Sequence, residues 1–322
     1  MSIIEETSVS CIGKYVNVIS EFASACKDRE QVFYFRGEGG DYGNTSCHPS
    51  IYRNGLPKSE HLIYRELIRF NENDFETDKA TIDHLCRMQH WLCPTRMLDL
   101  SEDAFSSLYF AVEKKKPGEA VIVYLFAIPK KKIKYYDSDT VTILANLAKL
   151  PLTHEDGETE YYGNKSKSDL LKNVKELMTR GMSLEEYNKK YFDFLLHHIK
   201  EDKPHMQNLI QPADIFSVLC VKTKLNTDRI RLQKGAFLLF GLNVHDVSKA
   251  IPLNGSYEKP HFWRDDVSPW VGTPIERILK IRIEGGISKE DLEHLGISMP
   301  YIYPDMQKVG EYLTELYSAK ST

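Results

Sequence analysis

The stretch AVIVYLFAI, residues 120–128, is a continuous apolar run of small, β-branched and aromatic residues. Such a run predicts a strand that is buried on both faces. A second stretch, QVFYFR at residues 31–36, is also rich in aromatic residues and is followed by GEGG at residues 37–40. It predicts another strand, which ends at these glycines. Together the two stretches indicate a buried sheet in the first half of the chain.

Helical periodicity surrounds these strands. Apolar residues recur at three- and four-residue steps and predict helices at 12–26, 58–73, 81–91, 104–114, 289–295 and 306–317. In the helix at 58–73, the residues expected to face inward are Leu62, Tyr64, Leu67, Ile68 and Phe70. Further strands are predicted at 215–223, 236–242 and 278–283. Because strands alternate with loops and helices without βαβ regularity, the sequence predicts an α+β fold of mixed sheets with flanking helices.

The middle of the chain differs in composition from the rest. Residues 151–204 are rich in Lys, Glu, Tyr and Asn, and they predict two helices, near 170–179 and 184–198. We therefore expect a helical insertion at 136–210. It would separate two parts of one domain, residues 1–135 and 211–322.

The overall composition is that of an ordinary globular protein, with 42% hydrophobic and 27% charged residues among 322. A net charge of −4 gives no global basic field for nucleic acid, and a local basic groove stays open as an alternative. No run approaches the roughly 18 apolar residues of a membrane span. The N-terminus carries acids where a secretion signal has Lys or Arg. The 6 scattered cysteines indicate reduced thiols. We expect a cytoplasmic protein without a membrane segment.

Arg36 and Gly37 form the first candidate site. A guanidinium beside a buried strand needs an anionic or carbonyl partner, because desolvation without one is costly. The glycine after it lets a ligand approach the backbone. The alternative is a structural salt bridge from Arg36 to Glu38 or Asp99.

The segment HLCRMQHWLCPTRMLD, residues 84–99, is the densest polar cluster in the chain. Its His84, Cys86, His90 and Cys93 suggest zinc ligands. Their spacing does not match the common structural zinc sites, which pair ligands two to four residues apart and then return. We therefore expect no bound metal.

A pocket is the preferred hypothesis for the same segment. His90, Thr95, Arg96 and Asp99 would face it, since Pro94 forces an extended turn. Arg96 would be a second cation that binds phosphate.

Several segments, in order along the chain, resemble the motifs of the FRG-domain family, which is named after Phe-Arg-Gly. The matching segments are YFRGE (34–38), PSIYR (49–53), QHWLCPTRMLD (89–99), SLYFA (107–111), RIRLQKGAF (229–237) and YPD (303–305). They extend over most of the chain and are interrupted by the expected insertion.

The sequence departs from the family pattern at two places, but it keeps the polar residues of the family motifs. Trp91-Leu92-Cys93 replaces the commoner Tyr-Gly-Leu, and Leu100-Ser101 replaces a Trp-Thr pair. The polar residues of the family motifs that are present here are Arg36, His90, Thr95, Arg96, Asp99 and Gln233. The resemblance therefore implies that the site has not been lost.

A weaker resemblance concerns the strand at 31–36. An aromatic strand that ends in Arg-Gly is similar to the first strand of ADP-ribosyltransferases, and it implies a fold of that type. It further implies that Arg36 binds a phosphate of NAD and that the backbone after Gly37 holds nicotinamide. Tyr109 would stack on nicotinamide, and Gln233 would take the late position near the ribose. That late element contains no glutamate.

The first functional hypothesis is therefore an enzyme that uses NAD as its substrate. Its catalytic residues would be Asp99, Gln233 and His90, with Asp99 or Glu38 supplying the missing carboxylate. The residues that would bind NAD are Arg36, Gly37, Thr95, Arg96 and Tyr109. Such an enzyme would be a bacterial toxin or phage-defence effector that modifies RNA, DNA or protein, with an antitoxin or immunity protein as a further partner.

Two other functions stay open. A nuclease would use His90 and Asp99 as acid and base, although no cluster of carboxylates suggests a two-metal centre. A non-catalytic module would sense a nucleotide or a phage component. The NAD hypothesis makes a geometric prediction that the others do not. The side chains that should converge on one cleft are Arg36, His90, Arg96, Asp99, Tyr109 and Gln233.

Overall fold

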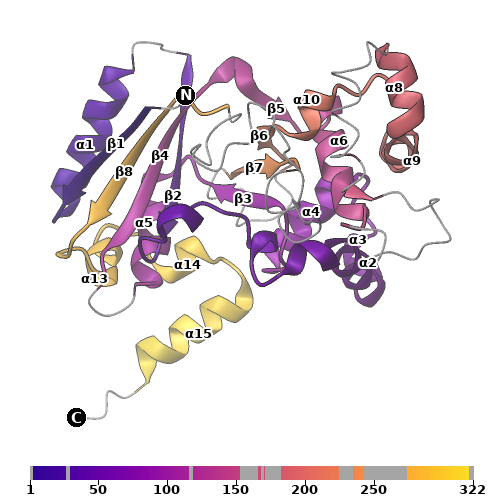
Figure 1. Ribbon diagram of the computed structural model, residues 1–322. Helices are drawn as coiled ribbons and strands as arrows, with labels where there is room; N and C mark the ends of the chain where they lie inside the picture. Colours follow the sequence, from indigo (N-terminus) through magenta and orange to yellow (C-terminus); the bar gives the residue numbers. More distant parts are fainter. Residues whose placement is uncertain are drawn as a thin grey trace.

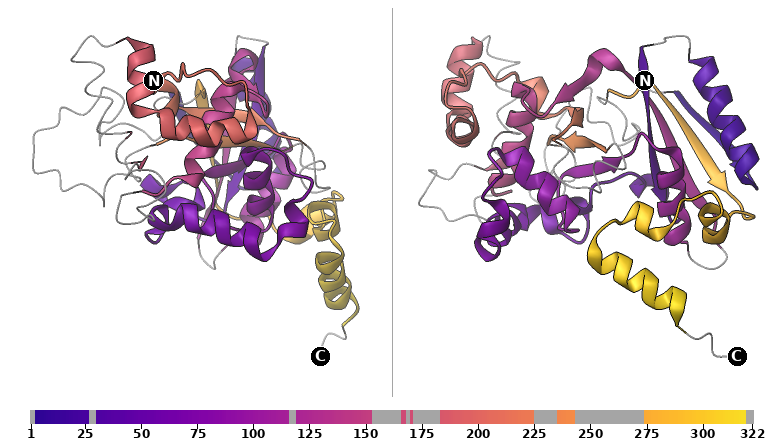
Figure 2. Two further views of the ribbon diagram at one scale, coloured as in Figure 1. Left: turned by 90° about the vertical axis from the view of Figure 1, so that its right-hand side faces the viewer. Right: turned by 180° about the vertical axis from the view of Figure 1, so that it is seen from behind.

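The computed structural model describes residues 3–26, 30–115, 119–152, 166, 167, 170, 183–224, 235–242 and 274–318. Within these residues the strands form two four-stranded sheets, with the orders β1-β8-β4-β2 and β3-β7-β6-β5. Helices lie against both sheets (Figures 1 and 2). The predicted α+β class of mixed sheets with flanking helices is confirmed.

The first sheet brings together strands from both ends of the chain. β1 (Ile3–Val9) pairs in parallel with β8 (Arg277–Ile283). β8 and β2 (Gln31–Glu38) lie on either side of β4 (Val121–Pro129) and run antiparallel to it. Every residue of β4 is buried, as the apolar run predicts. β2 continues two residues past its predicted end, because Gly37 and Glu38 also pair with β4.

The sequence predicts only two strands of the second sheet, β6 (Val218–Lys222) and β7 (Ala236–Phe240). The other two are β3 (Met97–Leu100), antiparallel to β7, and β5 (Ile133–Tyr135), parallel to β6. Both are too short to carry a periodic signal of their own.

The two sheets meet where β2 and β3 lie side by side. Phe35 and Ser101 exchange two backbone hydrogen bonds there, of 2.7 and 2.9 Å. Apolar side chains from both sheets, among them Tyr34, Phe126 and Leu238, pack together in one core. We call the region of the Phe35–Ser101 bridge the sheet junction.

The opposite face of the first sheet is covered by α1 (Ile12–Ala25), α5 (Ala104–Glu113), α13 (Lys289–Glu293) and α14 (Met299–Ile302). Buried side chains of these helices share a second core with alternate residues of β4. α15 (Met306–Tyr317) follows α14 and extends away from the body of the molecule (Figure 1).

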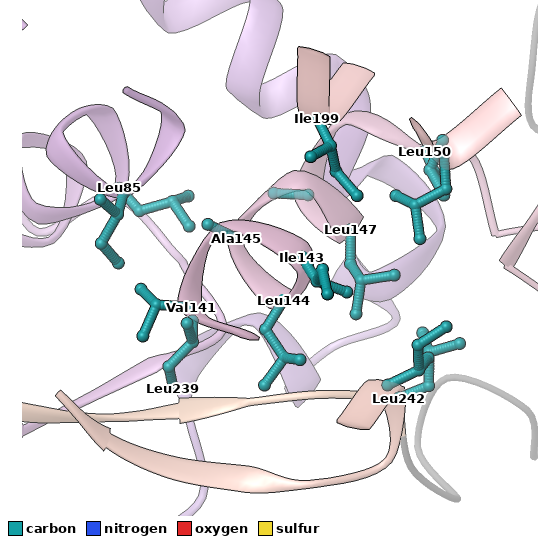
Figure 3. Packing of buried hydrophobic residues seen from close by; sticks show 14 of the residues in the cluster. Leu85, Val141, Ile143, Leu144, Ala145, Leu147, Leu150, Ile199, Leu239 and Leu242 are labelled. Atoms are coloured by element: carbon teal, nitrogen blue, oxygen red, sulfur yellow. The ribbon is translucent and has the colours of Figure 1, made fainter. Parts of the chain in front are cut away.

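Helices from the middle of the chain cover the second sheet. They are α2 (Glu60–Phe70), α3 (Glu72–Phe75), α4 (Thr81–His90), α6 (Asp139–Asn146), α8 (Leu184–Tyr191), α9 (Asp193–Asp202) and α10 (Pro212–Ile215). α6, which the sequence does not predict, contributes Val141, Ile143, Leu144 and Ala145 to a third core (Figure 3). This core contains residues from both sides of the predicted boundaries at 136 and 210. Apart from residue 170, the helix predicted near 170–179 lies outside the described residues.

Two expectations for α2 are wrong. Tyr64 is buried as predicted, but Leu62 and Phe70 are largely exposed, because only one narrow face of this surface helix meets the core. In the part of the chain that the structure describes, no helix is both long and apolar enough to cross a membrane.

Candidate functional site

Arg36 lies on the face of β2 that shares a core with the second sheet. Side chains alternate along the strand, so Tyr34 and Arg36 share this face while Phe35 and Gly37 face α5. Arg36 Nε donates to Glu38 Oε1 at 3.3 Å, and Arg36 Nη1 donates to the carbonyl oxygen of Asp99 at 3.2 Å. Burial alone would lower the pKa of the guanidinium, but Glu38, Cys47 and Asp99 together raise the pKa above its usual value, so Arg36 stays charged. Its side chain keeps 19% exposure.

Glu38 connects Arg36 to the loop that follows β2. Its side chain is buried, and Oε1 accepts hydrogen bonds both from Arg36 and, at 2.9 Å, from the backbone N–H of Cys47. Among the described residues, none forms a hydrogen bond with Glu38 Oε2. Burial raises the pKa of the Cys47 thiol well above its usual value, so the thiol stays neutral. Glu38 therefore orients Arg36 and fixes the loop at once.

Asp99 presents its carboxylate to solvent on the neighbouring strand. Oδ2 accepts a hydrogen bond from Gln89 Nε2 at 2.9 Å. Gln89 is oriented in turn by the hydroxyl of Thr95, which donates to Gln89 Oε1 at 2.5 Å and accepts from the N–H of Met97. This chain of hydrogen bonds links α4 to β3 and fixes the Asp99 side chain beside Arg36. Thr95 is almost fully buried, so it acts through Gln89 rather than on a ligand.

Arg96 is a structural residue, and the prediction that it binds phosphate is wrong. Its side chain is 0% exposed and forms an ion pair with Glu60 of α2, while Nη1 donates to the carbonyl oxygen of Phe240 at 3.0 Å. Lys167 donates to the same Glu60 carboxylate. Burial would raise the pKa of Glu60, but the two cations lower it to about 2. The burial of Arg96 could not be predicted from sequence periodicity. Arg96 directly precedes β3, and the alternation of side chains along that strand places it in the interior.

Gly37 allows two elements to pack closely, and this accounts for the glycine; its predicted contact with a ligand stays a prediction. A Cβ at this position would lie 1.8 Å from the carbonyl oxygen of Ser107 and 2.9 Å from the backbone nitrogen of Ala111. α5 therefore crosses directly over β2, and only glycine allows this approach.

Tyr109 lies in the core on the opposite face of the first sheet from Arg36. Its side chain is 0% exposed, and burial raises the pKa of its hydroxyl. The prediction that it forms the wall of a cleft with Arg36 is wrong. The apolar spacing of the helix at 104–114 already gives the reason, since Tyr109 belongs to its inward stripe.

His90 ends α4 and packs edge-on against the exposed Trp91, with ring centroids 5.1 Å apart. Of the four residues considered as zinc ligands, His84 forms a 2.6 Å hydrogen bond with Tyr64 through Nδ1, and burial lowers the pKa of its ring. In the described residues no group of three or more His, Cys, Asp or Glu is placed to hold a metal ion.

Gln233 lies outside the described residues, so its predicted role is untested. A cavity of about 630 Å³ lies beside α6, α9 and α10, and no predicted site residue lines it. Of the predicted set, the structure therefore brings Arg36 and Asp99 together and separates Arg96 and Tyr109 from them.

Comparison with known proteins supports the first resemblance. Residues 31–120 match the FRG domain, so the chain carries an FRG domain that includes β2, β3, α4 and α5. No curated protein and no solved structure matches the chain. The FRG assignment fits a nucleotide-related or nuclease-like module.

Two residues of the junction were not predicted: Gln89 and Cys47. The salt bridge from Glu38 to Arg36 was predicted, but the hydrogen bond from Glu38 to the loop after β2 was not. Gln89 is part of a quoted family motif, which is the signal that could have identified it. Cys47 has no sequence signal, because its role depends on a left-handed backbone (φ 57°). The arrangement offers a fixed guanidinium next to an exposed carboxylate. It is suited to a ligand that combines a phosphate with a group that becomes cationic.

Proposed function

We propose that this chain is an ADP-ribosyltransferase-type enzyme that binds NAD at the sheet junction. It breaks the bond between ribose and nicotinamide, releases nicotinamide and transfers the ADP-ribose to a nucleophilic group of an RNA, DNA or protein acceptor. The observation that carries the proposal is the hydrogen bond from Arg36 Nη1 to the carbonyl oxygen of Asp99. It holds a partly exposed guanidinium beside a residue whose carboxylate is exposed.

In this proposal Arg36 binds a phosphate of the dinucleotide. Its Nε and Nη1 are engaged by Glu38 and Asp99, and among the described residues nothing accepts a hydrogen bond from Nη2. A charged donor with a fixed orientation suits a phosphate oxygen, and its protein contacts prevent the side chain from reorienting when the ligand binds.

Asp99 supplies the negative charge that stabilises positive charge on the ribose as nicotinamide leaves. Gln89 and Thr95 keep the carboxylate in place and do not touch the substrate. Arg96 and Tyr109, which were expected to contact NAD, do not face this site. The nicotinamide ring would therefore need other contacts than a stack on Tyr109.

Release of nicotinamide from NAD by the full chain tests the proposal. We expect release by the wild type, and a loss of at least about tenfold in Arg36→Lys and Asp99→Asn, because each removes one preorganised interaction. Arg36→Lys keeps a cation beside Glu38 and therefore preserves the fold. Arg69→Ala is the matched control, since Arg69 forms an exposed ion pair with Glu66 on α2.

The outcomes separate the alternatives. No nicotinamide release by the wild type, with or without candidate RNA, DNA and protein acceptors, would contradict the transferase. Cleavage of RNA or DNA that depends on His90 and Asp99 would support the nuclease. Binding of NAD or ADP-ribose without turnover would support the sensing module.

A further inference from the structure

α15 exposes a large apolar surface. Within this helix of 12 residues no side chain is buried. Met306 is 91% exposed, Leu316 56% and Tyr317 81%. Figure 2 shows the helix projecting from the rest of the molecule in two further views. A folded chain seldom leaves an apolar patch of this kind in water unless another surface covers it.

The apolar residues form one stripe along the helix. Met306, Val309, Leu313 and Leu316 are separated by three, four and three residues, which is the spacing of the a and d positions in a coiled coil. Tyr312 and Tyr317 flank this seam. The charged residues Lys308, Glu311 and Glu315 lie on the remaining surface.

We propose that α15 pairs with α15 of a second copy of this chain, in an antiparallel arrangement that forms a dimer. A two-fold interface must be complementary to itself. The spacing three-four-three is the same in both directions, so an antiparallel copy places Met306 opposite Leu316 and Val309 opposite Leu313. Each apolar side chain of one copy thus meets one of the other.

Charge also favours an identical partner. The positions next to the seam are Gly310, Tyr312 and Tyr317, and none is charged. Two copies therefore meet without like-charge repulsion at the positions that select partners in coiled coils. A strongly charged partner would find no complementary charge there.

The helix is fixed to the body of the protein at its start, which supports pairing of so short an element. Tyr303, in the preceding turn, donates to Glu113 of α5 at 2.7 Å and so attaches the start of the helix to the body. The Asp305 side chain caps the helix by accepting a hydrogen bond from the N–H of Lys308 at 2.9 Å. Isolated helices of this length are marginal in water. We therefore expect a dimer that dissociates on dilution.

Sedimentation velocity of the full chain, over a concentration series that extends toward the millimolar range, tests the proposal. The wild type should shift from one to two chain masses as the concentration rises. Leu313→Glu and Leu316→Glu should each abolish this shift, since each places a charge in the seam. Thr314→Glu is the matched control, because it adds the same charge outside the stripe and should leave the dimer intact.

A wild type that stays monomeric throughout the series would overturn the proposal. A dimer that survives both seam variants would also overturn it, since the interface would then lie elsewhere. Thermal melts distinguish these results from misfolding: neither Leu313 nor Leu316 is buried, so both variants should melt with the wild type.

Discussion

Arg36 and Arg96 both fall in FRG motifs, and the sequence predicts the same role for both, yet the structure gives them opposite surroundings. Arg96 has no exposed surface, and its guanidinium donates hydrogen bonds to Glu60 and to the carbonyl oxygen of Phe240. Arg36 is partly exposed, and among the described residues none accepts a hydrogen bond from its Nη2, the group that would bind a phosphate in the proposed function. A motif arginine can therefore stabilise the fold or bind a ligand, and the distinction depends on burial and on how many of its donors the protein itself occupies.

The largest effect should come from breaking the buried pair. Arg96→Met leaves Glu60 facing Lys167 alone in the interior, and removal of one partner of a buried ion pair costs about 3–5 kcal/mol. Chemical denaturation measures the free energy of unfolding. A loss below about 1 kcal/mol would show that the two arginines do not differ as described.

Gly37→Ala should be nearly as harmful, because the clash is with the backbone of α5 and no rotamer change relieves it. We expect a loss of about 3 kcal/mol in the free energy of unfolding. Gly13→Ala in α1 is the matched control, since a Cβ there meets nothing within 4 Å. Equal stability of the two variants would contradict the packing of α5 on β2.

A pH titration extends the comparison to a buried base. Burial lowers the pKa of His198 in α9 to about 4, although Glu201 lies nearby. The unfolded state then binds more protons than the folded state below pH about 6.5, so stability is fully present above that pH and falls toward pH 4. We expect this loss, about 1–3 kcal/mol, to disappear in His198→Gln. An unchanged pH profile in the variant would show that the ring is not held neutral by the fold.

The smallest effect concerns the segment between α4 and β3. Leu92 has φ 61° and is largely exposed, at a position where the family commonly has glycine. Leu92→Gly should stabilise the protein by about 1 kcal/mol, because it relieves left-handed strain. Asn54→Gly, at φ 52°, should gain less, since asparagine tolerates this conformation. Equal or opposite changes would argue that Leu92 has another role.

Most of the fold was predicted from long segments that are either periodic or continuously apolar. The run at 120–128 and the helix at 306–317 were predicted nearly to the residue. β3 and β5 were missed because strands of four and three residues have no period to detect. α6 was missed because its six consecutive buried residues include the polar Thr142 and Asn146, so the buried positions are not marked by an apolar period.

The sequence predicted which segments form the candidate site, but not which of their side chains face it. A salt bridge from Arg36 to Glu38 was foreseen as an alternative, and it exists. Asp99 contacts Arg36 through its backbone carbonyl oxygen and not through its carboxylate. The sides on which Arg96 and Tyr109 lie were not foreseen, since strand register and helix packing depend on distant elements. Family motifs mark polar residues without stating which of them are buried.

The most direct test of the central claim is ADP-ribose binding by the full chain, measured by isothermal titration for the wild type and Arg36→Lys, with denaturation of both. We predict that Arg36→Lys unfolds within about 1.5 kcal/mol of the wild type and binds ADP-ribose at least about tenfold more weakly, since lysine lacks the planar fork. Binding that is unchanged in Arg36→Lys, or a stability loss as large as that of Arg96→Met, would contradict the account.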